Sequence, residues 1–168
     1  MKGLKTTLAT AIAFGLLAGS VVGVAAQDDP MAAAVVTGTI TPWSEESAGT
    51  TSVLDGASLM DGARFTNTWE ASDPRLSGST SITTNWKHYE GLRMLVEAAN
   101  YSLENEGGRW AGTATSLLGE RLGETDTVIL HGEDAYEGLS AYIVIDRASS
   151  TFNAAILPGG MPEFPTAE

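Results

Sequence analysis

Few residues of this sequence have the types that catalysis or metal binding requires. The chain has no cysteine, so thiol catalysis and zinc–thiolate sites are absent. Its two histidines are His88 and His131, and His131 is followed by two carboxylates, at Glu133 and Asp134. A histidine needs a defined set of partner ligands to hold a metal, and this cluster is too small, so we predict no metal site.

Enzyme motifs are also missing from the sequence. No serine lies in a Gly-x-Ser-x-Gly pattern, and no phosphate-binding or dinucleotide glycine motif is present. Two carboxylate pairs, Glu70 with Asp73 and Glu97 with Glu104, can serve as an acid and a base if they meet in space. We favour solvated acids at strand edges, and therefore predict no catalytic residue and no cofactor.

Aromatic side chains give the better indication of function. Seven of them fall on strand faces that the alternation of residue types places together, and Asn67 is the one polar residue among them. A small closed sheet can enclose such rings around one apolar ligand, or the rings can simply fill its core. The predicted ligand-binding set is Phe65, Asn67, Trp69, Trp86, Trp110, Tyr136, Tyr142 and Phe152.

The elements that carry these residues are predicted to be β-strands. Strict alternation, interrupted by turn residues at short spacing, marks about eight of them. They are residues 34–42, 64–70, 76–86, 109–118, 127–132, 138–146 and 151–157, with one more before the turn at 105–108. We therefore predict an antiparallel, all-β closed barrel over residues 34–158.

Two segments are harder to interpret. Residues 92–99 have apolar residues at helical spacing, yet the two glycines at 107 and 108 suit a tight hairpin, which needs a strand on both sides. We favour a strand there. Residues 44–62 are rich in Gly, Ser, Thr and acids and are predicted to be a loop with at most one short strand, around residues 52–54.

The ends of the chain indicate export. Lys2 and Lys5 precede an uncharged stretch that ends in small residues at 24–26, which is typical of a secretory signal peptide over residues 1–26. An uncleaved membrane anchor is the alternative. A flexible leader, 27–33, and a Pro-rich tail, 159–168, flank the domain, and we predict a secreted or periplasmic protein.

The charge of the chain limits its partners. The formal net charge is −12, and loss of the two lysines of the signal peptide makes it more negative. Nucleic acid and anionic membrane surfaces are therefore poor partners, and no stable membrane insertion is expected after cleavage. One strand, 138–146, is apolar on both faces, so we predict a homo-oligomer contact through Leu139, Ala141, Ile143 and Ile145.

Three segments, 73–78, 104–113 and 132–139, resemble small exported bacterial proteins of unassigned role. More distantly they are similar to the barrel shared by allene oxide cyclase and dirigent proteins. This resemblance implies an eight-stranded antiparallel barrel with an apolar interior, often trimeric. It carries no catalytic residue to this chain.

From these observations we predict an exported barrel that binds a small apolar or aromatic ligand without turnover. The alternatives are an enzyme of the cyclase or dirigent type, which steers a reactive intermediate in an apolar cavity, and a structural barrel with no ligand. A polar group inside the barrel would favour the enzyme.

Overall fold

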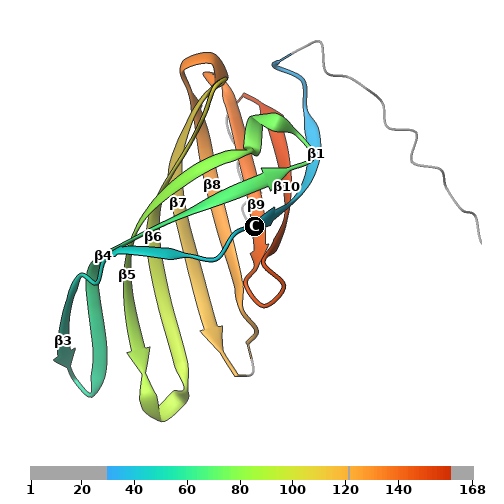
Figure 1. Cartoon of the computed structure of the whole chain (residues 1–168). Coiled ribbons are helices and arrows are strands. Elements are labelled where there is room, and N and C mark those ends of the chain that lie inside the picture. Colours follow the sequence, from blue (N-terminus) through green and yellow to red (C-terminus); the bar gives the residue numbers. More distant parts are fainter. Residues whose placement is uncertain (1–29, 121, 160–168) are drawn as a thin grey trace, which may run out of the picture.

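The computed structural model describes residues 30–120 and 122–159, so the predicted signal peptide, the first three residues of the leader and nearly all of the tail lie outside the described residues. The described chain is all-β (Figure 1). Its strands are β1 (Ala34–Ile40), β2 (Ser44–Ser47), β3 (Thr50–Leu54), β4 (Ala57–Ala71), β5 (Gly78–Tyr89), β6 (Met94–Asn105), β7 (Gly108–Gly119), β8 (Thr125–Glu133), β9 (Leu139–Asp146) and β10 (Thr151–Pro158). Three short 3-10 helices join them: η1 (Pro74–Leu76), η2 (Glu90–Leu92) and η3 (Asp134–Tyr136).

The ten strands form one antiparallel sheet that closes into a ring. Each strand from β4 to β9 pairs with the next in the chain, and β1 pairs with both β10 and β4. The closing contact between β1 and β4 is short, at three residue pairs, whereas β6 and β7 pair over their full length. The ring is therefore not a regular barrel.

A bulge in β4 explains part of this irregularity. The pairing of β4 with β5 shifts between Met60 and Ala63, and Gly62 there has a φ of +69°, which favours glycine. Its amide donates a hydrogen bond to Oδ1 of Asn85, at 2.7 Å. Before the bulge, the first residues of β4 remain paired with β5 on one side and with β3 on the other (Figure 1).

The inside of the ring is filled by alternate residues of its strands. Buried side chains include Trp69, Leu103, Trp110, Ile143 and Phe152. A Cβ atom on Gly38 would overlap the Phe152 ring, so glycine at this position lets a large aromatic side chain fit inside a narrow ring.

Several sequence predictions about elements need correction. Residues 44–62 are not a loop, because β2, β3 and the start of β4 occupy most of them. Leu76 lies in η1, where Asp73 accepts a hydrogen bond from the Arg75 amide and Pro74 supplies a suitable φ, and β5 begins at Gly78. The strand interpretation of residues 92–99 is confirmed from Met94 onwards by β6.

The face assignment of β9 was wrong. Leu139, Ala141, Ile143 and Ile145 are buried inside the ring, while Tyr142 is half-buried on the outer face, paired with Ile129 and Ala155. Both faces of this strand are apolar, and the face that lies inside the ring is the more aliphatic one. The four predicted contact residues are thus not accessible to a partner, and self-association stays a prediction without an assigned surface.

Candidate ligand-binding site

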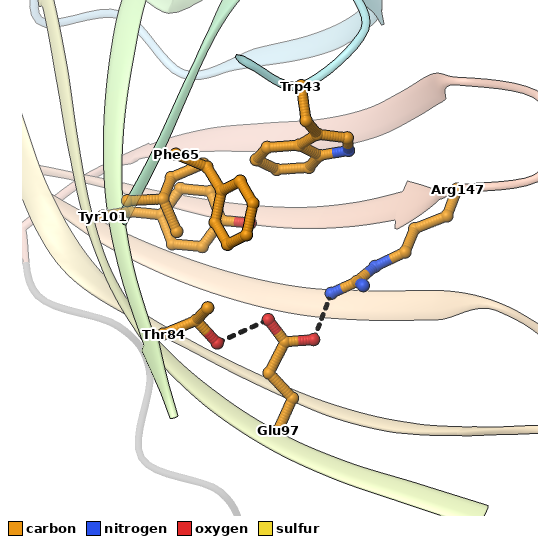
Figure 2. Close-up of a pocket in the computed structure, with 7 residues that line it drawn as sticks. Trp43, Phe65, Thr84, Glu97, Tyr101 and Arg147 are labelled. Carbon is orange, nitrogen blue, oxygen red and sulfur yellow. Dashed lines mark hydrogen bonds and ion pairs between the residues drawn. The ribbon is translucent and has the colours of Figure 1, made fainter. Parts of the chain in front are cut away.

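A cavity of about 230 Å³ opens at the end of the ring where β9 turns into β10. Apolar and aromatic side chains form much of its wall, and three polar side chains complete it (Figure 2). The lining residues are Trp43, Phe65, Ile82, Thr84, Glu97, Tyr101 and Arg147.

Trp43 covers part of this cavity from the connection between β1 and β2. Pro42 precedes it, and proline cannot donate a hydrogen bond to a continuing strand, so the chain leaves β1 here. The Trp43 ring meets Phe65 edge to face, with centroids 6.5 Å apart and planes at 81°. Trp43 is 39% exposed, so it stands between the cavity and the solvent.

Strand register places two carboxylates near the cavity on one row of the sheet. Glu97 of β6 pairs with Ser116 of β7, and Ser116 pairs with Asp126 of β8. Two acids separated by one strand lie about 10 Å apart, which is close enough for one long side chain to bridge them. The Ser116 hydroxyl donates a short hydrogen bond to Oδ1 of Asp126.

Arg147 supplies that bridge. It is the first residue after β9, and its guanidinium donates from Nε to Oδ2 of Asp126 at 2.7 Å and from Nη2 to Oε2 of Glu97 at 2.5 Å. The other oxygen of Glu97 accepts a hydrogen bond from Thr84 at 2.6 Å. Asp126 is fully buried behind the arginine, so its only ionic partner in the described chain is Arg147.

Burial and the charges of this cluster shift the pKa values of two side chains, Arg147 and Tyr101. Burial acts against the charged guanidinium, but Asp126 and Glu97 outweigh burial and raise the pKa of Arg147. Burial, and after it the charge of Asp126, raises the pKa of the Tyr101 hydroxyl well above its usual range. Tyr101 is therefore neutral, and its hydroxyl has no hydrogen-bond partner among the described residues.

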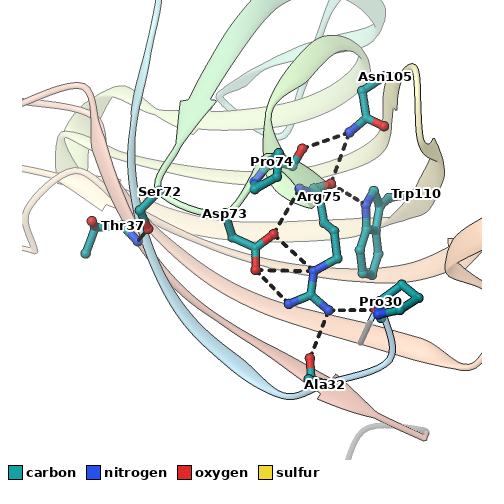
Figure 3. Close-up of polar contacts among 9 residues, drawn as sticks. All are labelled: Pro30, Ala32, Thr37, Ser72, Asp73, Pro74, Arg75, Asn105 and Trp110. Atoms are coloured by element: carbon teal, nitrogen blue, oxygen red, sulfur yellow. Dashed lines mark hydrogen bonds and ion pairs between the residues drawn. The ribbon is translucent and has the colours of Figure 1, made fainter. Parts of the chain in front are cut away.

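A second arginine cluster is formed around Arg75 (Figure 3). It lies at the other end of the ring, because Arg75 precedes the start of β5 whereas Arg147 follows the end of β9. Arg75 donates to both oxygens of Asp73, with Nη2 2.6 Å from Oδ2, and its Nη1 donates to the backbone oxygens of Pro30 and Ala32, each at 2.8 Å. Burial opposes the charge of Asp73, but hydrogen bonds from Arg75 outweigh it and lower the pKa of this carboxyl.

Asn105 and Trp110 complete this second cluster. The amide nitrogen of Asn105 donates to the carbonyl oxygens of Pro74, Arg75 and Ser77, and Nε1 of Trp110 donates to the Arg75 carbonyl at 2.8 Å. The Trp110 ring stacks on Tyr136, whose hydroxyl donates to Oδ1 of Asn105. These bonds fasten η1 and the start of the described chain to the ring.

The structure separates the eight residues that sequence reasoning grouped. Phe65 alone lines the cavity. Trp69 and Phe152 pack together in the core, with centroids 5.0 Å apart. Trp110 and Tyr136 belong to the Arg75 cluster at the other end of the ring.

The remaining three predicted residues lie in different surroundings. Asn67 is buried on the predicted inner face; its side chain accepts a hydrogen bond from Thr80, and its Nδ2 atom has no partner among the described residues. Trp86 lines a separate depression with Leu95 and Leu118, among others. Tyr142 lies on the outer face.

Sequence reasoning did not assign six lining residues to a ligand site: Trp43, Ile82, Thr84, Glu97, Tyr101 and Arg147. It interpreted Glu97 as a solvated acid, but the side chain is nearly buried. One signal for them was present, because Glu97 shares a strand face with Ala99, Tyr101 and Leu103, and a lone carboxylate on an otherwise apolar inner face needs a buried partner. Arg147 gave no such signal, because an arginine in a hairpin turn is ordinarily exposed.

Comparison of the chain with protein-family models, characterised proteins and solved structures finds no match. Within residues 30–120 and 122–159, no helix is long and apolar enough to cross a membrane. The same part of the chain contains no group of three histidine or acidic side chains that could hold a metal ion.

Proposed function

We propose that this protein binds one small apolar or aromatic ligand in the cavity beside Trp43, without turnover and outside the cytoplasm. In this proposal the ring is a barrel of the allene oxide cyclase or dirigent type that encloses the ligand. The observation that carries the proposal is the cavity of about 230 Å³, walled by Trp43, Phe65, Ile82 and Tyr101. An apolar protein cavity of about 150 Å³ binds benzene, so this one has room for one or two rings.

An enzyme that steers a reactive intermediate is the second candidate. Glu97, Tyr101 and Arg147 favour it, because they put proton-exchanging and charged groups against an apolar wall. Against it, both Glu97 oxygens already accept hydrogen bonds, and the neutral Tyr101 is held far from the pKa of a general base at neutral pH.

The test is binding of a neutral fluorescent probe, N-phenyl-1-naphthylamine, to the purified protein. We expect saturable binding with one site per chain. Trp43→Ala removes one wall of the cavity and should weaken binding about tenfold or more. Trp86→Ala, which removes a half-buried tryptophan outside the cavity, is the matched control and should leave the affinity unchanged.

Two results would contradict the proposal. One is that the probe does not bind to the folded protein. The other is that Trp86→Ala weakens binding as much as Trp43→Ala, which would place the probe elsewhere. Conversion of the bound molecule into a new product, detected by mass spectrometry, would replace the binding protein with the enzyme.

A further inference from the structure

The charges around the cavity do not cancel. Glu97 and Asp126 each carry one negative charge and Arg147 carries one positive charge, so the cluster has a net charge of −1. The Arg75 cluster at the other end pairs one arginine with one aspartate and is neutral. The cavity is thus the place where a buried negative charge lacks full compensation, and burial makes that deficit stronger than it would be in water.

Glu97 is the group through which a ligand would meet this charge. Its side chain is only 11% exposed, and it lines the cavity directly. Each of its oxygens accepts one hydrogen bond, from Thr84 or from Arg147, and each carboxylate oxygen can accept a second. Asp126 lies behind Arg147 with no exposed surface, so it contributes charge but no contact.

The Tyr101 hydroxyl is a second, independent indication of a ligand. The Tyr101 side chain lines the cavity, and the residue is only 4% exposed. Its hydroxyl has no hydrogen-bond partner among the described residues. Because Tyr101 lines the cavity, a ligand atom or a water there can supply the hydrogen-bond partner of this hydroxyl. Burial raises the pKa of Tyr101 most, and the charges of Asp126 and Glu97 raise it further against the opposing charge of Arg147.

Aromatic rings supply the rest of the wall. The faces of Trp43, Phe65 and Tyr101 carry negative electrostatic potential, which attracts a cation within about 6 Å of a ring centroid. Among the described residues, the cation that lies over a ring is Lys87, which covers Tyr89 and not a ring of the cavity. Figure 2 shows Trp43 and Phe65 on the side of the cavity away from Glu97.

We infer that the cavity takes a small organic ammonium ion, with its cationic group near Glu97 and Tyr101 and its apolar body against Trp43 and Phe65. This inference rests on the proposed function, because it names the class of ligand for the same cavity. Ammonium N–H groups suit the free lone pairs of Glu97 and the Tyr101 oxygen. An anion would instead add to an uncompensated negative charge.

The experiment compares three ligands of one shape and different charge: 2-naphthylmethylammonium, 2-naphthylmethanol and 2-naphthoate. Calorimetric titration of the purified protein at pH 7.5 gives each affinity. We expect the ammonium to bind about tenfold more tightly than the alcohol, and the carboxylate to bind most weakly. Glu97→Gln should reduce the preference for ammonium over alcohol at least about fivefold. Glu104→Gln, on the same strand but exposed, is the matched control.

The outcomes separate this inference from the proposed function. If the alcohol or the carboxylate binds as tightly as the ammonium, the inference is overturned while the binding function stands. If none of the three binds, both are overturned. The ligand series uses the unaltered protein, so it decides the question even if Glu97→Gln does not fold.

Discussion

Arg75 and Arg147 lie near opposite ends of the ring. The Arg75 cluster includes Tyr136 of η3, which comes before the start of β9, whereas Arg147 follows the end of β9. Each arginine pairs with a shielded carboxylate, but the remaining contacts differ. Arg75 donates its other hydrogen bonds to the backbone carbonyls of Pro30 and Ala32. Arg147 bridges two acids on the wall of a cavity.

This difference shows how to separate a structural ion pair from a candidate site in the same fold. A lowered or raised pKa occurs in both clusters and does not distinguish them. The hydrogen-bond partners do distinguish the two clusters. Arg75 and Asn105 donate mainly to backbone carbonyls, and their cluster fastens the chain. Around Arg147, carboxylate lone pairs and a hydroxyl remain free beside an apolar wall, so that cluster can recognise a ligand.

The largest expected effect is on stability, from Arg147→Met. The change leaves Asp126 charged, fully buried and without its ionic partner, so we expect a loss of about 3–5 kcal/mol in the free energy of unfolding, measured in urea. The double variant Asp126→Asn with Arg147→Met removes the stranded charge and should recover part of that loss. If the free energy of unfolding of Arg147→Met alone lies within about 1 kcal/mol of that of the unaltered protein, the described ion pair is contradicted.

Arg75→Met should cost less, about 2–3 kcal/mol, because Asp73 is partly exposed and water can replace some of the lost contacts. The probe affinity of the folded protein should not change. Arg109→Met, which removes an arginine from exposed ion pairs, is the control and should cost less than about 1 kcal/mol. A weaker probe affinity in Arg75→Met would mean that the two ends are coupled, against the comparison drawn above.

Trp110→Phe tests whether an aromatic residue of the Arg75 cluster has a structural role only. It removes the hydrogen bond to the Arg75 carbonyl and some stacking on Tyr136, so about 1–2 kcal/mol of stability should be lost. Binding of N-phenyl-1-naphthylamine should be unchanged. The opposite pattern, with full stability and lost binding, would place the ligand at this end of the ring.

The smallest effect concerns acid pH and Asp73. The folded-state pKa of this carboxyl is lowered, so its contribution to stability is present above about pH 4 and is lost as the pH falls through the folded value. Asp73→Asn should therefore be less stable than the unaltered protein at pH 7, and the difference should shrink as the pH falls below about 4. A difference that stays constant over this range, in thermal unfolding, would contradict the assignment.

Much of the fold follows from local sequence. The alternation through Phe65, Asn67 and Trp69 correctly predicted an inner face, and Gly107 with Gly108 correctly indicated the β6–β7 hairpin. Residues 44–62 were misjudged because their strands are mostly exposed and polar, and they form by pairing with β4 rather than by burying a face. In β9 both faces are apolar, so alternation cannot decide which one lies inside.

The candidate site was harder to predict, for a physical reason. Glu97, Asp126 and Arg147 meet only because the registers of β6, β7 and β8 align on one row, and register is a property of the whole sheet. Aromatic residues were grouped by type, although a ring of this length has two ends and a core between them. Trp110 and Phe65 therefore share a predicted face without sharing a site.

The most direct test of a ligand site beside Trp43 is a crystal structure of the protein soaked with 6-bromo-2-naphthylmethanol, in which anomalous scattering locates the bromine. The prediction is one bromine site inside the cavity bounded by Trp43, Phe65, Ile82 and Tyr101. A bromine bound instead beside Trp86 and Leu118, near Trp110 and Tyr136, or nowhere in the ring would contradict it.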